Sequence, residues 1–353
     1  MNIQVSLRTE PKTQPDFTKG PVPFGKNLTD HMFFMDYDTD KGWHSPRIVP
    51  EGPVLFDLST SAMHYGQSIF EGLKAYNTKD GSINLFRPYE NAQRFNKSAA
   101  RLSMPEFPVE YMVDAIKALV DIDKSWIPDM PGTSLYIRPF MFASEPTLNI
   151  TPSTNYTFCI LLSPVASISG GKPFDIVVEE HYIRAAPGGT GFAKCAGNYA
   201  AAVRASAEAN KNGFHQVLWL DAVHRKYIEE VSAMNVFFVI DGKLITPLAG
   251  DTILDGVTRK SIVQIVKDWG HPVEERNIAI DELLDAHASG KISEVFCAGT
   301  AAVITPIASI TYGDTRMEFN GGQVGQLSTK IYEELVGIQT GALVDTRGWI
   351  EKI

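Results

Sequence analysis

The sequence predicts an α+β protein of two domains. Its 353 residues exceed what one ordinary hydrophobic core holds, and its 44% hydrophobic and 21% charged content is typical of globular proteins. Strand-like runs and segments of helical periodicity occur in both halves. SISGGKP, residues 167–173, is small and polar with two glycines and a proline, so it is the expected linker between domains 1–166 and 174–353.

The first half is predicted to contain a hairpin, two helices and two long strands. Two apolar runs flank Asp80 and Gly81 in LKAYNTKDGSINLFRP, and this pair suits a tight turn that needs positive φ. Apolar residues at helical spacing predict helices over about 89–102 and over VEYMVDAIKALVDI. SLYIRPFMFAS and YTFCILLSPV are predicted to be buried strands.

The second half is predicted to begin with the strand FDIVVEEHYIRA, followed by a glycine-rich loop and a helix over about 198–212. Further strands are expected in QVLWLD, KYIEEV, NVFFVIDGKLITPL and EVFCAGTAAVITPI, the third as a hairpin around Asp241 and Gly242. Helices over about 258–269 and 281–287 complete the α+β pattern.

Composition and motifs argue against several classes of partner. The net charge of −9 disfavours nucleic acid, which needs clustered Lys and Arg, and no apolar run is long enough to cross a bilayer. The N-terminal residues lack the features of a signal or transit peptide, and Cys159, Cys195 and Cys297 are scattered. We therefore expect a cytoplasmic protein without disulfides. The histidines form no HxxxH or HExxH pair, so no metal site is expected.

Glycine-rich nucleotide motifs are absent. Every Gly-Lys pair is followed by Asn, Pro, Leu or Ile, so there is no P-loop. GGTGFAK departs from GxGxxG and lacks the acidic residue expected about twenty positions later in a dinucleotide site.

Lys194 has unusual neighbours for a lysine. In GFAKCAGNYAAAVRA it lies among Gly, Ala and Cys at the start of a small-residue helix. Either the glycines form a surface loop and the lysine is incidental, or a bulky group fills the space that these small side chains leave.

Three features could bind a phosphate. Gly256-Val257-Thr258 precedes a helix, whose first N–H groups and dipole favour an anion. CAGTAA, residues 297–302, is a strand that runs into a turn of small residues. Arg94 lies on the helix predicted in the first half. Each has an ordinary alternative: an N-cap, a tight turn and an exposed helix arginine.

A buried carboxylate is indicated by the strand that holds Glu229 and Glu230. Alternation points the two side chains to opposite faces, so one can point inward, where it needs a cationic or N–H partner. The alternative is that both lie at the rim of the strand. A lysine, a phosphate cradle and a carboxylate are together what pyridoxal phosphate requires.

With these residues in place, the chain resembles the branched-chain amino acid aminotransferases, pyridoxal-phosphate enzymes of fold type IV. The resemblance is carried by a collinear series that spans nearly the whole chain. It consists of PFGKNLTDHMF, HYGQSIFEGLKAY, LFRPYENAQRFNKSA, SLYIRPFMFASEPTLNI, GFAKCAGNYAAA, IEEVSAMNVFFV, LDGVTRKSI and GTAAVITPI. It implies a D-amino-acid-aminotransferase-like fold with the cofactor between the two domains, and a homodimer.

The resemblance implies which residues bind pyridoxal 5'-phosphate: Arg94, Lys194, Tyr199, Glu230, Val257, Thr258 and Thr300. Lys194 matches the catalytic lysine, which forms the Schiff base and carries the proton. Glu230 matches the partner of the ring nitrogen, and Tyr199 the tyrosine that bonds the phenolic oxygen. The others match the phosphate cradle.

The resemblance also implies which residues bind substrate, some of them from the neighbouring subunit: Phe24, Tyr65, Phe70, Tyr136, Arg138, Ala301 and Ala302. The aromatic side chains form an apolar cage for leucine, isoleucine or valine, while Arg138 with Tyr136 holds the side-chain carboxylate of glutamate. The amides of Ala301 and Ala302 receive the substrate's α-carboxylate. Phe24 and Phe70 have the alternative of being ordinary core residues.

The expected activity is reversible transamination of L-leucine, L-isoleucine and L-valine with 2-oxoglutarate. A D-amino-acid aminotransferase or aminodeoxychorismate lyase of the same fold type is one alternative, and a binding protein without turnover is another. A redox CxxC found in some relatives after the Gly-Thr turn is replaced by Ala302-Val303-Ile304-Thr305, so no thiol switch is expected. Residues 167–173 are expected to double as a flap over the pocket.

Overall fold

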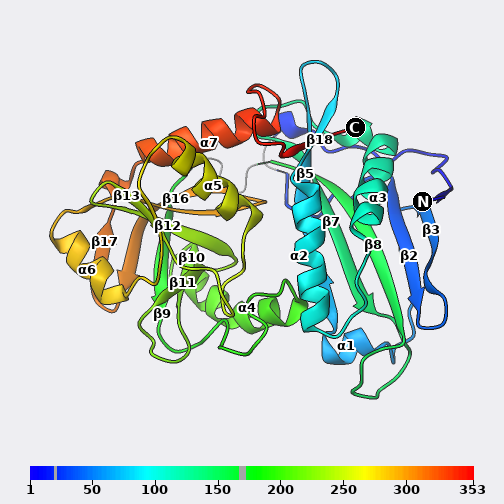
Figure 1. The fold of residues 1–353 in the computed structure, drawn as a ribbon, viewed down its shortest axis with the longest axis horizontal. Helices are drawn as coiled ribbons and strands as arrows, with labels where there is room; N and C mark the ends of the chain where they lie inside the picture. Colours follow the sequence, from blue (N-terminus) through cyan, green and yellow to red (C-terminus); the bar gives the residue numbers. More distant parts are fainter. Residues whose placement is uncertain (20–21, 167–171) are drawn as a thin grey trace. The chain divides into compact units, whose positions relative to one another are not determined.

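The computed structural model describes residues 1–19, 22–166 and 172–353, and the chain forms two compact units (Figure 1). Unit 1 comprises residues 1–168, 193–196 and 337–353, and unit 2 comprises residues 169–192 and 197–336. The division differs from the expected domain limits in two segments, because contacts group 193–196 and 337–353 with unit 1. Most of the expected linker and flap, residues 167–171, lies outside the described ranges.

Unit 1 is built on one mainly antiparallel sheet with the strand order β1-β3-β2-β8-β7-β5-β6-β18, and β4 pairs with β7. Its strands are β1 (Gln4–Val5), β2 (His31–Asp38), β3 (Gly42–Pro50), β4 (Ser68–Phe70), β5 (Leu73–Asn77), β6 (Ile83–Phe86), β7 (Ser134–Ala143), β8 (Asn155–Val165) and β18 (Ile350–Lys352). Its helices are α1 (Ser61–Tyr65), α2 (Pro88–Arg101) and α3 (Val109–Ile122).

Strand alternation divides this sheet into two different faces. In β7, Leu135 and Ile137 belong to the main core of unit 1, which also contains Phe95 of α2 and Ile116 of α3. Since neighbouring strand residues point to opposite faces, Tyr136 and Arg138 lie on the face away from these helices. The opposite face of β2 and β8 holds a small separate cluster around Phe34.

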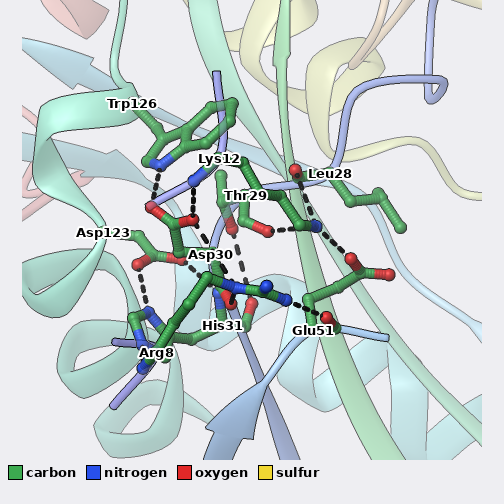
Figure 2. Close-up of polar contacts among 9 residues, drawn as sticks. All are labelled: Arg8, Lys12, Leu28, Thr29, Asp30, His31, Glu51, Asp123 and Trp126. Carbon is green, nitrogen blue, oxygen red and sulfur yellow. Dashed lines mark hydrogen bonds and ion pairs between the residues drawn. The ribbon is translucent and has the colours of Figure 1, made fainter. Parts of the chain in front are cut away.

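A polar cluster fixes the N-terminal segment to the sheet of unit 1 (Figure 2). His31 Nε2 accepts the backbone N–H of Arg8 at 2.8 Å, so the ring carries its proton on Nδ1 and donates it to Asp123 at 2.6 Å. Asp30 Oδ1 accepts the backbone N–H of Lys12 at 2.7 Å. These contacts hold the chain just before the segment that carries Phe24.

Unit 2 contains a sheet that closes on itself. Its strands follow the order β11-β10-β9-β16-β15-β12-β13-β14; β17 pairs with β16, and a further pairing of β11 with β12 completes a ring. The strands are β9 (Phe174–Glu179), β10 (Gln216–Leu220), β11 (Ile228–Val231), β12 (Met234–Ile240), β13 (Lys243–Thr246), β14 (Val273–Glu275), β15 (Ile292–Gly299), β16 (Val303–Tyr312) and β17 (Thr315–Glu318). The helices are α4 (Ala196–Lys211), α5 (Val257–Asp268), α6 (Ile280–Ala288) and α7 (Gln326–Gln339), whose last residues belong to unit 1.

Most of the predicted elements are confirmed. The helix predicted over VEYMVDAIKALVDI is α3, with the same limits, and the hairpin turn at Asp241 and Gly242 has φ of 48° and 73°. FDIVVEEHYIRA is a strand only as far as Glu179. No element was predicted for β2, β3 or α7.

Candidate active site

Lys194 is docked onto unit 1 through its backbone. Its N–H donates to Ser98 Oγ at 2.9 Å, and its carbonyl accepts the N–H of Phe70 at 3.0 Å. Cys195 forms an isolated β-bridge with Ile69. The Nζ atom of Lys194 lies 5.0 Å from the centre of the Phe70 ring. These contacts explain why residues 193–196 belong to unit 1 while their neighbours in sequence belong to unit 2.

Arg94 is buried and rigidly held, so the alternative of an exposed helix arginine is wrong. Its side chain makes a two-point ion pair with Glu71, with Nε to Oε1 and Nη2 to Oε2 each at 2.8 Å. Glu71 also accepts the N–H of Gly72 at 3.1 Å and is fully buried, whereas Arg94 is 8% exposed. A fork-to-fork pair fixes the plane of the guanidinium. Ser98 Oγ donates to the Arg94 carbonyl at 3.2 Å, so one hydroxyl links the arginine to Lys194.

Phe24, Phe70 and Tyr136 gather around Arg138. Its guanidinium carbon lies 4.6 Å from the centre of the Phe70 ring and 5.3 Å from that of Tyr136, and Nη2 donates to the Tyr136 hydroxyl at 3.2 Å. Phe24 packs edge-on against Tyr136, and the centres of the two rings are 4.9 Å apart. A Cβ at Gly72 would lie 2.0 Å from the Tyr136 hydroxyl, so this ring position requires glycine there. Phe24 is 43% exposed, and its alternative as a core residue is wrong.

Arg138 also has an unused donor. Its Nε is buried and has no hydrogen-bond partner in the part of the chain that the structure describes. A buried N–H of a guanidinium is costly to leave unpaired, so this cation is suited to an acceptor from outside.

Tyr65 lies in a different environment from the other candidates. It ends α1, its hydroxyl donates to the Leu148 carbonyl, and the ring is 43% exposed. The structure gives no contact between Tyr65 and the group around Arg138 within the described residues.

In unit 2, Glu230 is held at both carboxylate oxygens. Oε1 accepts the N–H of Leu254 at 3.0 Å and Asn235 Nδ2 at 3.2 Å, and Oε2 lies 3.2 Å from Arg184 Nε. Its neighbour Glu229 is also buried, which contradicts the alternative that both side chains lie at a rim. Burial raises the pKa of the Glu229 carboxyl, only partly offset by a hydrogen bond with Thr252 and the charge of Arg184.

The predicted helix N-terminus is the start of α5. Gly256 is the extended residue before the helix, and Val257 and Thr258 are buried in its first turn, where N–H groups have no partner within the helix. A Cβ at Gly256 would lie 2.1 Å from Asn235 Oδ1. Asn235 therefore touches both Glu230 and the start of α5.

The predicted turn of small residues joins β15 to β16. The strands pair as far as Gly299 and Val303, so Thr300, Ala301 and Ala302 form the loop of this hairpin. Val303 adopts φ of 58°, which is strained for a β-branched residue. Tyr199 lies in the first turn of α4.

The predicted site residues thus fall into two groups. Lys194 and Arg94 lie together in unit 1, linked by Ser98, and Phe24, Phe70, Tyr136 and Arg138 form a cluster there. Tyr199, Glu230, Val257, Thr258, Thr300, Ala301 and Ala302 belong to unit 2. Sequence reasoning did not assign roles to Glu71, Ser98, Arg184 or Asn235. Glu71 stands inside the quoted HYGQSIFEGLKAY, and an acidic side chain between Phe70 and Gly72 was the available signal.

The expectations about a metal site and a membrane span can be compared with the described residues. These residues contain no group of three or more His, Cys, Asp or Glu side chains that could hold a metal. None of the helices formed by these residues is long and apolar enough to span a membrane. The three cysteines are free and buried.

Comparison with known families matches this chain to one family model. The model for amino-transferase class IV matches residues 68–310. The chain is 47% identical over 353 residues to branched-chain-amino-acid aminotransferase 2 of Bacillus subtilis (strain 168), covering 99% of this chain and 97% of the relative. It is 49% identical over 350 residues to a probable branched-chain-amino-acid aminotransferase of Staphylococcus aureus (strain MRSA252), covering 98% and 97%.

Solved structures resemble the fold. The branched-chain amino acid aminotransferase from Escherichia coli superposes with a TM-score of 0.74 at 28% identity, covering 91% of this chain and 98% of that one. A T.th. branched-chain amino acid aminotransferase complexed with N-(5'-phosphopyridoxyl)-L-glutamate gives a TM-score of 0.72 at 28% identity, covering 90% and 97%. The predicted fold class is confirmed by this likeness.

Proposed function

Since this chain belongs to the class IV aminotransferase family, we propose that it is a branched-chain-amino-acid transaminase that uses pyridoxal 5'-phosphate. It transfers the amino group of L-leucine, L-isoleucine or L-valine to 2-oxoglutarate and back, giving branched-chain 2-oxo acids and L-glutamate. The observation that carries the proposal is that Ser98 bonds both the Lys194 N–H and the Arg94 carbonyl. The backbones of the two residues that carry the amine and the guanidinium such a cofactor needs are thereby linked.

The described residues fit this cofactor. Pyridoxal phosphate has an aldehyde, a phosphate and a basic ring nitrogen, which call for an amine, an anion site and a carboxylate. Lys194 provides the amine and Glu230 the carboxylate. Arg94 and the N-terminal turn of α5 at Val257 and Thr258 provide the anion site, with Thr300 as a further ligand.

Each of these residues has a defined chemical task. When bound, pyridoxal phosphate supplies a carbonyl that condenses with amines and a ring that accepts the electrons left by loss of the substrate Cα proton. The Lys194 amine takes that proton from the substrate Cα and delivers it to the cofactor carbon that bears the transferred nitrogen. Glu230 holds a proton at the ring nitrogen, and the Tyr199 hydroxyl donates to the phenolic oxygen.

The substrate cluster suits two unlike side chains. Burying the branched side chain against Phe24, Phe70 and Tyr136 contributes about 0.8 kcal/mol per CH₂. The unpaired Nε of Arg138 and the Tyr136 hydroxyl suit the second carboxylate of glutamate. We propose that the amides of Ala301 and Ala302 bind the α-carboxylate that all these substrates share.

We propose further that the protein is a homodimer. Leu55, Leu58 and Ile150 are 100%, 84% and 82% exposed, and a hydrogen bond from the Thr147 N–H to the Ser59 carbonyl joins the loops that carry them. Such a concentration of exposed apolar side chains is typical of an interface. A second copy covers this patch, and Tyr65 beside it reaches the partner's substrate pocket. We retain the expectation of a cytoplasmic protein, which three free buried thiols support.

The proposed function is tested by the absorption spectrum of the protein loaded with pyridoxal phosphate. L-leucine should bleach the cofactor band, and 2-oxoglutarate should then restore it. A band that responds to D-alanine and not to L-leucine would move the protein to the D-amino-acid branch of the fold. A band that responds to no amino acid would favour a binding protein, and no band at all would refute the proposal.

A further inference from the structure

Arg184 places a positive charge directly against Glu230. Arg184 Nε lies 3.2 Å from Glu230 Oε2, and both side chains are almost completely buried. The other oxygen, Oε1, accepts hydrogen bonds from two neutral donors, the N–H of Leu254 and the amide of Asn235. The two oxygens of one carboxylate thus have partners of different kinds.

A single loop holds both members of this pair. The Nη2 of Arg184 donates to the Thr252 carbonyl, and two residues later the Leu254 N–H donates to Glu230. The loop therefore offers an acceptor to the cation and a donor to the anion. This arrangement fixes the two side chains relative to each other without the help of solvent.

The neighbouring carboxylate shows the effect of a position with fewer partners. Glu229 is buried near the same arginine, but its Oε2 has no hydrogen-bond partner within the described residues. Burial raises the pKa of Glu229, with the charges of Glu230 and Asp221 acting in the same direction. Two carboxylates share the field of one guanidinium here, and the close ion pair is the one with Glu230.

We propose that Arg184 is a positioning residue that keeps Glu230 ionised, so that the proton between Glu230 and the cofactor stays on the ring nitrogen. The inference rests on the proposed function. A carboxylate bonded to a pyridine nitrogen can lose its charge by taking the proton from that nitrogen. The positive charge of Arg184 lowers the proton affinity of Glu230 and opposes this transfer. A protonated ring withdraws electrons far better than a neutral one, so the assignment bears directly on the chemistry.

The test is the ¹⁵N resonance of pyridoxal phosphate labelled at its ring nitrogen, bound to wild-type protein, Arg184→Gln and Arg184→Lys. Wild type and Arg184→Lys should show the protonated position, and Arg184→Gln should shift towards neutral pyridine. The L-leucine half-reaction of Arg184→Gln should slow roughly ten- to a hundredfold, the factor for one to two pKa units. Arg276→Gln is the matched control, since Arg276 pairs with Glu282 at the surface of the same unit. Its resonance should equal that of wild type.

An unchanged resonance in Arg184→Gln would overturn the inference. If that variant does not fold, Arg184→Lys decides, because a neutral ring beside a retained positive charge would equally overturn it. In a Glu230→Gln background, replacing Arg184 should cause no further shift, whereas an additional shift would show that the arginine acts elsewhere. Absence of bound cofactor in the wild type would instead refute the proposed function, and this inference with it.

Discussion

Glu71 and Arg94 form a two-point ion pair in the core of unit 1, with both N–O distances at 2.8 Å and the carboxylate fully buried. The pair connects the strand region that precedes β5 to the middle of α2. It determines which way the guanidinium faces, because a planar fork bonded at two points cannot rotate.

Removing the carboxylate should leave a buried charge uncompensated. We expect Glu71→Ala to lower the free energy of unfolding of the apo-protein by about 3–5 kcal/mol, and to weaken binding of pyridoxal phosphate. Urea denaturation and a fluorescence titration measure the two effects. Glu351→Gln, which breaks a partly exposed pair with Lys117, should change stability by no more than about 1 kcal/mol. Equal losses in the two variants would contradict the role given to Glu71.

Ser98→Ala should disturb Lys194 without touching its side chain. The Lys194 N–H loses its acceptor in a partly buried place, which costs about 1 kcal/mol of stability, and the lysine segment loosens. The rate at which the apo-protein incorporates the cofactor, followed by absorption, should fall. Ser163→Ala in the same unit removes a hydrogen bond of 2.8 Å to the Asn27 carbonyl and should leave this rate unchanged. A rate equally reduced by both substitutions would count against a specific link through Ser98.

Val303→Gly should stabilise the protein. A non-glycine residue at φ of 58° costs roughly 1–2 kcal/mol, and glycine relieves this strain. The larger conformational entropy of glycine in the unfolded chain offsets part of the resulting stabilisation. We expect a net increase of about 0.5–1 kcal/mol in thermal or urea unfolding. Val303→Ala keeps the Cβ and should gain less. Destabilisation by glycine would mean that packing of the valine outweighs its backbone strain.

Lys74 should make stability rise with pH. Burial lowers its pKa from 10.5 to about 8, so between these values the unfolded chain binds more protons than the folded one. The contribution is unfavourable below pH 8 and is relieved as the pH rises towards 10.5. From about pH 7 to about pH 10, wild type should gain about 2–3 kcal/mol relative to Lys74→Met in urea unfolding. Lys79→Met, at an exposed position of the same hairpin, should show no such difference.

A charge in the exposed apolar patch should prevent dimer formation. Leu58→Glu and Ile150→Glu are expected to sediment as monomers, because a carboxylate would be buried in the interface without a partner. Val344→Glu, at another exposed apolar position of unit 1, serves as the control and should stay dimeric. Dimers in all three variants would place the interface elsewhere.

Elements with a strong local signal could be predicted from the sequence. The apolar stripe of α3 and the Asp241-Gly242 turn encode their structures within a few residues, and both are confirmed. The strands β2 and β3 carry aromatic and charged residues in less regular order, and no element was predicted there. Their structure depends on pairing with each other and with β8, which is a long-range property.

The site shows the same limit at the level of single side chains. Residue type and a collinear resemblance were sufficient to single out Lys194, Arg94 and Glu230. The partners of these residues could not be predicted from the sequence. Ser98 bonds Lys194 across 96 positions of sequence, and Arg184 pairs with Glu230 from another segment. A serine or an arginine in a short window gives no sign of the group that it will contact.

The path of the chain has a consequence for protein engineering. The chain passes between the two units after residues 168, 192, 196 and 336, and β18, which pairs with β6, follows the whole of unit 2 in the sequence. A gene cut after residue 166 would encode a fragment that lacks residues 193–196, which include Lys194. The fragment would also lack β18, so β6 would become an unpaired edge of the sheet. Neither unit can therefore be exchanged as a single cassette, and a stop codon after residue 336 would damage the unit whose other strands were translated first.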